Sequence, residues 1–295
     1  MGDRGLSNRA TPTGRGANRR DDLNYEAIQT AAADIRRLTG RGEHHVAAVL
    51  GSGLSGYAQH LPGAIAVPYS DITGFPVPRV AGHAGTAYSV ELGGVPTLIL
   101  AGRAHFYEGH GLDQVVFAVR AAVAAGARTV LLTNASGGCG EHLEAGDLVL
   151  LSDHLNLTGQ NPLFGPNDDR MGTRFPDLSA AYDPDLRRVA HEIASEVDVA
   201  VKEGVYAWFS GPTYETPAEV QMAKRLGADM VGMSTVPETI AARHMGARVI
   251  AISLVTNLAA GISPVPLSHE EVQETADAAR ERFTRLVDAL LPRLG

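Results

Sequence analysis

Three side chains that could bind an anion and a sugar follow one apolar stretch of the sequence. Residues 95–100 are typical of a buried strand, and Arg103, His105 and Tyr107 come directly after them. In an extended segment these three side chains alternate onto one face and can point into one cavity. A guanidinium beside an imidazole suits an oxyanion, and a tyrosine offers a flat ring with a polar tip. The alternative is a purely structural role. It would require an Arg and a His at the end of an apolar strand although neither binds a ligand.

Two later strand-like stretches also end in residues suited to a site. Residues 228–233 deliver Met233 and Ser234, and residues 247–257 end in Asn257. In an open α/β sheet, ligands sit beyond the carboxyl ends of the strands. The positions of these residues therefore make them site candidates.

Two helix starts are marked by capping boxes, in which a hydroxyl and a carboxylate three residues later satisfy backbone N–H groups reciprocally. One box pairs Thr235 with Glu238, and the other pairs Thr216 with Glu219. Glu219 is therefore expected to serve the cap. Glu215 has no such task, so its carboxylate could accept hydrogen bonds from a ligand.

A glycine turn follows the first strand-like stretch, residues 45–50. The turn, residues 51–56, matches part of the dinucleotide fingerprint, but residues 62–63 are Pro-Gly and leave no room for a full crossover helix. Its backbone N–H groups and the Ser52 hydroxyl could hold a phosphate, or the glycines could serve tight packing alone. His83 lies between glycines in a predicted loop, either as a second ligand to the anion or as a lone surface histidine.

Composition bounds the class of protein. The chain has 295 residues and a formal net charge of -8, which argues against nucleic-acid or anionic-membrane partners. Its one cysteine, Cys139, cannot form an internal disulfide, and we expect it to be inert in a reducing cytosol. Residues 1–20 are predicted to be a disordered tail, with the five arginines there as a solvated terminus rather than a nucleic-acid arm. Residues 21–295 are predicted to form one domain.

The remaining pattern alternates strands with helices, which indicates an α/β fold. Predicted helices cover residues 28–38, ended by Gly40, then residues 112–123, and a long C-terminal stretch capped by Ser268 and Glu271; predicted strands cover residues 129–133, 147–151 and 205–209. Residues 134–138 are expected to form a turn small enough for a ligand to lie against bare backbone. The long segment 156–175 is expected to be functional or to contact a partner.

Seven motifs occur in the order and approximate spacing of one family: GSGL at Gly51, GRAHFYEGH at Gly102, TNASGG at Thr133, GQNPLFGPND at Gly159, GPTYETPAE at Gly211, VGMSTVPE at Val231 and TN at Thr256. Nearly everything after residue 21 resembles the trimeric purine nucleoside phosphorylases of the 6-oxopurine type. The resemblance implies one α/β domain around a twisted mixed sheet flanked by helices, the phosphorylase fold. It also implies a cytoplasmic homotrimer that cleaves purine nucleosides with inorganic phosphate as co-substrate, with no metal or other cofactor.

Site residues follow from the same resemblance. The phosphate is expected to contact Ser52, His83, Arg103, His105, the backbone N–H of Ala135, and Ser234. The ribose is expected to contact Tyr107, Met233 and His269, and the purine Tyr214, Glu215 and Asn257. Among these, Asn257, Glu215 and His105 are the predicted catalytic residues.

This sequence departs from many relatives at three positions. Ala101 replaces a Gln and Ser136 replaces an Ala, but neither change removes a contact side chain. The aromatic residue that a neighbouring subunit lends to the ribose pocket in this family matches Met171 here. Either Phe175 substitutes for it, or an apolar Met suffices.

The predicted reaction is attack of bound phosphate on the anomeric carbon while Asn257 and Glu215 stabilise the departing base. The closest rival is a methylthioadenosine phosphorylase, which has an Asp where this chain has Asn257. Asn suits a carbonyl oxygen at the purine 6-position, whereas a carboxyl suits an amino group. Two rivals of a different class are a non-catalytic nucleoside-binding module and an NAD-dependent oxidoreductase. The oxidoreductase hypothesis is supported only by the incomplete glycine fingerprint at residues 51–56.

Overall fold

The computed structural model describes residues 24–51, 55–77, 85–263 and 269–295. Within this part of the chain, nine strands form one mixed sheet in the order β2-β3-β4-β1-β5-β8-β7-β6-β9. The strands are β1 (Val46–Leu50), β2 (Ile65–Pro68), β3 (Thr86–Leu92), β4 (Val95–Ala101), β5 (Thr129–Gly138), β6 (Leu148–Asn156), β7 (Val201–Trp208), β8 (Met230–Gly232) and β9 (Arg248–Leu258). The predicted tail, residues 1–20, lies outside the described residues.

The sheet closes on itself over half its width. β5 pairs with β8 on one side and with β9 on the other, so β5, β8, β7, β6 and β9 form a ring. The long parallel pairing of β5 with β9 runs from Thr129 to Gly138, with a register shift between Ser136 and Gly137. Such an irregularity re-aims the backbone locally, and these residues lie at the pocket described below.

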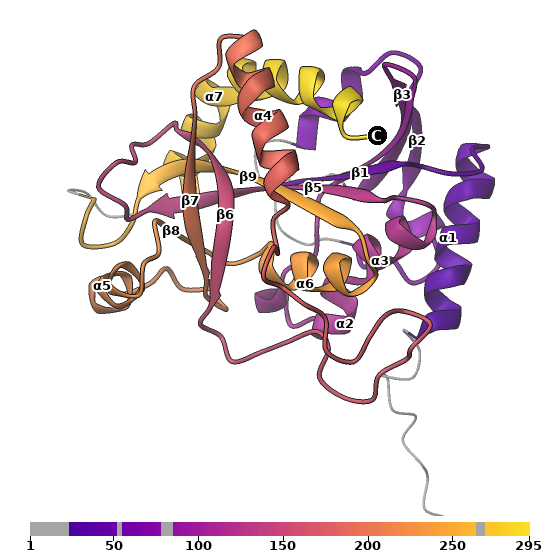
Figure 1. Ribbon diagram of the computed structural model, residues 1–295, viewed down its shortest axis with the longest axis horizontal. Helices are drawn as coiled ribbons and strands as arrows, with labels where there is room; N and C mark the ends of the chain where they lie inside the picture. The colour runs from indigo at the N-terminus through magenta and orange to yellow at the C-terminus, as the bar shows by residue number, and fades with distance from the viewer. Residues whose placement is uncertain (1–23, 52–54, 78–84, 264–268) are drawn as a thin grey trace, which may run out of the picture.

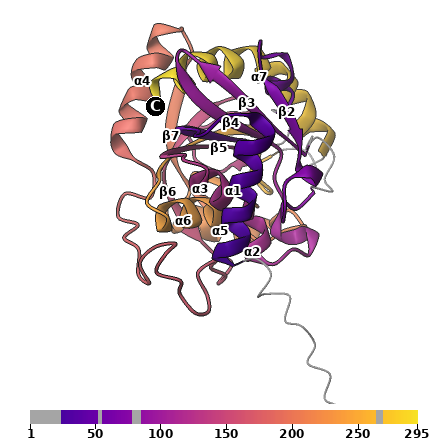
Figure 2. The ribbon, with the colours of Figure 1, turned by 90° about the vertical axis from the view of Figure 1, so that its right-hand side faces the viewer.

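Helices cover both faces of the sheet (Figures 1 and 2). One face carries α1 (Tyr25–Thr39), α2 (Leu112–Val115), α3 (Phe117–Ala124) and α6 (Val236–His244); the opposite face carries α4 (Pro184–Glu196) and α7 (His269–Leu290). The helix α5 (Pro217–Arg225) stands beside the closed half of the sheet (Figure 1). Short 3-10 turns are formed by Ser55–His60, Tyr69–Asp71, Phe106–Glu108 and Leu291–Arg293.

The apolar core lies in two layers, one on each face of the sheet. β1 is buried at all five positions, with Ala47 and Val49 in the layer under α1 and α3. Val46, Ala48 and Leu50 belong to the other layer, beneath α4 and α7. A strand covered on both faces reads as a continuous apolar stretch, which is why residues 45–50 predicted a buried strand correctly.

Helix boundaries follow the local signals. α1 begins after Asn24, whose side-chain oxygen accepts from the Ala27 N–H, and it ends at Gly40 with φ of 65°. The capping box between Thr216 and Glu219 is confirmed at the start of α5. No helix among the described residues is long and apolar enough to cross a membrane.

Three predicted elements differ from the structure. The helix over 112–123 is two helices, because the Val116 N–H is shared between the carbonyls of Leu112 and Gln114 and the turn tightens there. Residues 134–138 are not a turn: β5 continues to Gly138 because β9 pairs with it throughout. The segment after β4 is not extended to Tyr107, since a 3-10 turn begins at Phe106.

Candidate active site

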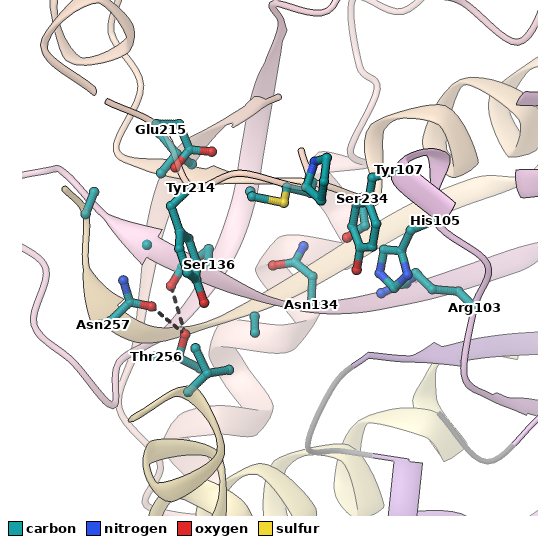
Figure 3. A pocket seen from close by; sticks show the side chains of 18 residues that line it. Arg103, His105, Tyr107, Asn134, Ser136, Tyr214, Glu215, Ser234, Thr256 and Asn257 are labelled. Carbon is teal, nitrogen blue, oxygen red and sulfur yellow. Dashed lines mark hydrogen bonds between the residues drawn. The ribbon is translucent and has the colours of Figure 1, made fainter. Parts of the chain in front are cut away.

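A pocket opens where β5, β8 and β9 end and the segments after β4 and β7 meet (Figure 3). Its volume is about 270 Å³, and its lining comes from six separate parts of the chain. The lining residues are Arg103, His105, Tyr107, Asn134, Ala135, Ser136, Gly137, Pro212, Tyr214, Glu215, Val231, Gly232, Met233, Ser234, Thr256, Asn257, Ala259 and Val272. Polar groups in a concave, largely apolar setting are typical of a small-molecule site.

The structure brings nine of the predicted site residues together in this pocket. They are Arg103, His105, Tyr107, Ala135, Tyr214, Glu215, Met233, Ser234 and Asn257. Ser52 and His83 lie outside the described residues. His269 is the first residue of α7, and its side chain also falls outside the part of the chain that is described.

Arg103 lies at one end of the pocket and is 4 % exposed. Its Nε donates to Glu238 Oε1 at 3.0 Å and its Nη1 donates to the Thr133 carbonyl at 2.5 Å. These two bonds fix the plane of the guanidinium. A Cβ at Gly51 would lie 2.8 Å from the Thr133 carbonyl oxygen and 3.1 Å from Arg103 Nη1, so glycine is required there for the close approach.

His105 is held beside Arg103 by the carboxylate of Glu108. Glu108 Oε1 accepts from the His105 backbone N–H at 2.7 Å and lies 3.2 Å from His105 Nδ1. The imidazole stacks on the Tyr107 ring, with centroids 4.8 Å apart. Burial, and then the charge of Arg103, lowers the pKa of His105 to about 3, so the imidazole is neutral at physiological pH.

Tyr107 lies between the two ends of the pocket (Figure 3). Burial raises the pKa of its hydroxyl to about 12, and the negative charge of Glu108 adds to the effect. The group is therefore a phenol, able to donate a hydrogen bond, across the physiological range. Its ring supplies a flat surface against which a sugar or a base can pack.

Ser234 stands at the start of α6, next to an unusual turn. Its backbone N–H donates to Tyr206 Oη at 3.3 Å, and its hydroxyl lies 3.1 Å from Thr235 Oγ1. Thr235 Oγ1 also accepts from Asn134 Nδ2 at 2.8 Å. One half of the capping box predicted for this helix is confirmed, since Glu238 Oε2 accepts from the Thr235 N–H at 3.1 Å. The other half is not formed, because the Thr235 side chain makes no hydrogen bond to the helix backbone N–H groups that it was predicted to cap.

The opposite end of the pocket carries Glu215 and Asn257 (Figure 3). Glu215 is 7 % exposed, and its Oε1 is buried without a hydrogen-bond partner among the described residues. Burial is the main reason that the pKa of Glu215 is raised above 4.5. A buried carboxylate oxygen that lacks a partner costs free energy, and a ligand N–H would remove that cost.

Asn257 is 5 % exposed and is oriented by its neighbours in β9. Its Oδ1 accepts from Thr256 Oγ1 at 3.0 Å, and its Nδ2 donates to the Leu258 carbonyl at 3.0 Å. A carboxamide has two N–H donors and two oxygen lone pairs. One donor and one lone pair of Asn257 therefore remain for a ligand.

Sequence reasoning missed the buried polar groups that support the site from behind. Ser253 Oγ lies 2.6 Å from Asn134 Oδ1 and 2.7 Å from Ser136 Oγ, and Asn134 continues the chain of hydrogen bonds to Thr235. The capping-box spacing explains Glu238 only as a cap, although this residue also holds Arg103. The sequence did contain a signal for these groups, namely polar residues within otherwise apolar strands. Such residues must find hydrogen-bond partners when they are buried.

Cys139 follows β5 and takes no part in the pocket lining. It is 2 % exposed, and its thiol donates to the Ala228 carbonyl at 3.3 Å. Burial raises the pKa of the thiol to about 12, so the reactive thiolate is not formed at physiological pH. Among the described residues, no group of His, Cys, Asp and Glu side chains is arranged to hold a metal ion.

The two ends of the pocket suit different chemical groups. Arg103, His105 and Ser234 offer cationic and neutral donors to an anion, whereas Glu215 and Asn257 match a flat ring that carries both N–H and carbonyl groups. Tyr107 and Met233 line the same pocket, and both lie beside Gly211. A molecule that joins these groups through a sugar fits this order.

Comparison with known proteins agrees with the fold and with the pocket. A family model described as the phosphorylase superfamily matches residues 45–292. Purine nucleoside phosphorylase 1 of Geobacillus stearothermophilus is 46% identical over 269 residues, which cover 91% of this chain and 98% of that protein. The purine nucleoside phosphorylase of Mycobacterium tuberculosis is 50% identical over 269 residues, which cover 91% of this chain and 96% of its own.

A solved structure gives the same result in three dimensions. The purine nucleoside phosphorylase of Schistosoma mansoni in complex with inosine aligns with a TM-score of 0.87 at 37% identity, covering 92% of this chain and 98% of the other. The predicted fold class is thereby confirmed, because this chain has a mixed sheet flanked by helices (Figure 1) and its structural alignment with that phosphorylase covers nearly the full length. The chain belongs to the phosphorylase superfamily and, within it, to the purine nucleoside phosphorylases.

Proposed function

We propose that this protein catalyses the reversible phosphorolysis of 6-oxopurine nucleosides such as inosine and guanosine, and of their deoxy forms. The products are the free base and ribose or deoxyribose 1-phosphate. The observation that carries the proposal is the order of groups along one pocket: anion-binding side chains at one end, Glu215 and Asn257 at the other. The relatives are named for this activity, and one was solved with inosine bound.

The reaction needs opposite charges to be stabilised at the two ends of the substrate. As the bond between the anomeric carbon and the purine nitrogen breaks, its electron pair stays on the base and positive charge develops on the sugar. A phosphate oxygen then forms the new bond to the anomeric carbon from the opposite face, with inversion. The departing base takes a proton from water. Stabilising both developing charges by preorganised groups is the main source of rate acceleration expected here.

Arg103, His105 and Ser234 are assigned to the phosphate, together with Ser52, His83 and the backbone N–H of Ala135. The neutral imidazole of His105 carries no positive charge before phosphate binds, so Arg103 supplies the main electrostatic attraction. When the phosphate dianion binds, its charge favours the protonated imidazole, and His105 can then share a proton with it. No covalent nucleophile is required, because phosphate is itself the attacking group.

Glu215 and Asn257 are assigned to the purine, with Tyr214 against the ring. Glu215 accepts from the ring N–H, which gives its buried Oε1 the partner it lacks within the described chain. Asn257 uses its remaining amide N–H and lone pair for the carbonyl and imidazole edge of the base. Tyr107, Met233 and His269 are assigned to the ribose.

A single assay tests the proposal. Inosine is incubated with the protein in the presence and absence of inorganic phosphate, and hypoxanthine and ribose 1-phosphate are quantified. Release of both products only when phosphate is present is the expected result. Binding of inosine without phosphate-dependent release would leave a nucleoside-binding module, and release without phosphate would indicate a hydrolase.

The rival substrate class is the 6-aminopurine nucleosides. Asn257 favours the 6-oxo class, since its amide N–H can donate to a carbonyl oxygen. Adenosine and methylthioadenosine in the same assay are therefore expected to be poor substrates. A higher kcat/KM for either one than for inosine would reverse the assignment.

The assembly and the compartment also belong to the proposal. We infer a homotrimer from the family motifs, and a reducing cytosol from the presence of a single cysteine. The reaction as drawn requires no cofactor, because phosphate is consumed as a substrate. Light scattering of the purified protein measures the assembly directly.

A further inference from the structure

The carboxylate of Glu238 joins two segments that meet at the anion end of the pocket. It is 2 % exposed and sits in the first turn of α6. Its Oε1 accepts from Arg103 Nε at 3.0 Å, and its Oε2 accepts from the Thr235 N–H at 3.1 Å. Arg103 follows β4 and Thr235 follows β8, strands that are not neighbours in the sheet. One side chain therefore sets the relative position of two phosphate-binding segments.

The turn held by Glu238 is strained. Thr235 has φ of 69° and ψ of -48°, and the Val236 N–H donates to the Ser234 carbonyl at 2.7 Å across it. This is a γ-turn with positive φ, a rare conformation that is costly for a β-branched residue. Such strain persists only where the surroundings impose it, and it concentrates at functional sites. Glu238 bonds the Thr235 backbone and Asn134 bonds its hydroxyl, so both sides of the turn are fixed.

Resting on the proposed function, we infer that Glu238 is a positioning residue for phosphate. Its two oxygens hold the Arg103 guanidinium and the turn that presents Ser234 in one arrangement, so that both can bind the same anion. A carboxylate this close to an anion site weakens phosphate binding by its charge alone. Its presence is therefore explained by geometry, because a guanidinium binds an oxyanion well only when its planar fork is correctly aimed.

Glu219, the equivalent glutamate at the start of α5, serves as a control that distinguishes this role from ordinary helix capping. Glu219 occupies the same position in the capping box of α5, with Thr216 before it and Pro217 at the first helical residue. Its Oε2 accepts from the Thr216 N–H at 2.7 Å. Glu219 is exposed, whereas Glu238 is buried against Arg103. The same substitution at the two positions removes a carboxylate from the same local motif.

The test is the steady-state kinetics of Glu238→Gln, with Glu219→Gln as control. Glutamine retains the capping-box function, but its single carbonyl oxygen cannot accept from both Arg103 and Thr235. We expect Glu238→Gln to raise the KM for inorganic phosphate about tenfold or more, with the KM for inosine changed less than about twofold. Glu219→Gln is expected to leave both values unchanged.

A second variant covers the case in which Glu238→Gln does not fold. Glu238→Asp keeps the charge but is one methylene too short to reach both partners, so the KM for phosphate rises here as well. The increase in thermal unfolding temperature caused by phosphate is expected to shrink in both variants and not in the control. Normal phosphate KM values in both variants, or tighter phosphate binding from the lost negative charge, would overturn the inference. Absence of phosphorolysis in the unmodified protein would instead overturn the proposed function.

Discussion

In the proposed function, the Asn257 carboxamide is the group that distinguishes a carbonyl oxygen from an amino group on the purine. Two of its four hydrogen-bonding positions are occupied by Thr256 and Leu258. Because those bonds fix which atom is oxygen and which is nitrogen, the amide N–H that remains has a defined direction. A site that donates to a substrate carbonyl rejects an analogue that presents an amino group there, since the donor is left unpaired.

Replacement of Asn257 is therefore expected to change both rate and preference. Asn257→Ala should lower kcat for inosine about a hundredfold or more, the usual cost of removing one donor that stabilises developing charge. Asn257→Asp should lower the ratio of kcat/KM for inosine to that for adenosine, because a carboxyl can accept from an amino group. Parallel assays of the two nucleosides with saturating phosphate measure both effects. Near-normal turnover of inosine by Asn257→Ala would remove this residue from the mechanism.

Glu215 gives a prediction about pH. Burial raises its folded-state pKa above 4.5, so the protonated form is favoured by folding. Its contribution to stability is complete below pH 4.5 and is lost as the pH rises through the raised pKa. Glu215→Gln is therefore expected to be at least as stable as the natural protein at neutral pH without ligand, as urea unfolding can measure.

The same substitution is expected to weaken catalysis, and more for guanosine than for inosine. A carboxylate can accept from both the ring N–H and the 2-amino group of guanine, whereas glutamine offers one oxygen. Loss of about a hundredfold in kcat/KM is expected for guanosine. In the natural protein, the KM for both nucleosides should rise as acid protonates Glu215, beginning above pH 4.5. A rise of KM in acid that persists in Glu215→Gln would contradict this assignment.

At the scale of elements, the long connection between β6 and α4 is anchored to the C-terminal end of α6. Gly172 packs against the last turn of that helix so closely that an added Cβ would overlap the His244 carbonyl oxygen. Gly165 lies in the same connection with φ of 108°, and a Cβ there would meet no atom within 4 Å. The connection carries Met171 and Phe175, so its position matters beyond its own stability.

Gly172→Ala should consequently be more destabilising than Gly165→Ala. Both variants place a side chain at positive φ, but only the first must also displace backbone, which costs about 1–3 kcal/mol. Thermal unfolding followed by circular dichroism compares the two variants with the natural protein. Equal melting temperatures for the two would show that the connection does not depend on its contact with α6.

Some elements could be predicted from short sequence patterns, without knowledge of the contacts made in the folded chain. The apolar stretch of β1, the end of α1 at Gly40 and the capping box at Thr216 were predicted from the sequence, whereas the start of α1 after Asn24 was not. The end of β5 was not, because Gly137 and Gly138 resemble a turn. A Cβ at Gly138 would lie 2.9 Å from Val255 Cγ1, so the glycine serves a close approach to β9 that only the folded chain reveals.

The candidate site divides in the same way. Side chains that directly follow strands could be predicted from position and type, and the family motifs assigned them roles. The supporting bonds could not, because they join residues far apart in the sequence: Arg103 with Glu238, and Asn134 with Ser253. The capping-box spacing already gave Glu238 a role within its own helix. Nothing in the sequence therefore pointed to its second partner, Arg103.

For the whole molecule, two phenylalanine side chains of one connection lie largely exposed on the surface of the single chain. Phe175 is 86% exposed and Phe164 is 70% exposed, both in the connection anchored by Gly172. Met171, the position that matches the family's shared aromatic residue, instead packs partly against its own subunit's core. Exposed aromatic surface of this kind favours contact with another molecule. We therefore expect Phe175, rather than Met171, to reach the ribose pocket of a neighbouring subunit in the proposed trimer.

Complementation between two variants of reduced activity tests whether the site is shared between subunits. Asn257→Ala removes the base contact within a subunit, and Phe175→Ala, expected to lower kcat/KM about tenfold, removes the contact lent to the next one. If both are co-expressed and assemble at random, roughly a quarter of the sites combine an intact Asn257 with a neighbour's intact Phe175. Activity should then recover to about that fraction of the natural rate, several times the average of the separate variants. Co-expression of Asn257→Ala with Met171→Ala is the matched control, and recovery in that pair alone would assign the shared role to Met171 instead.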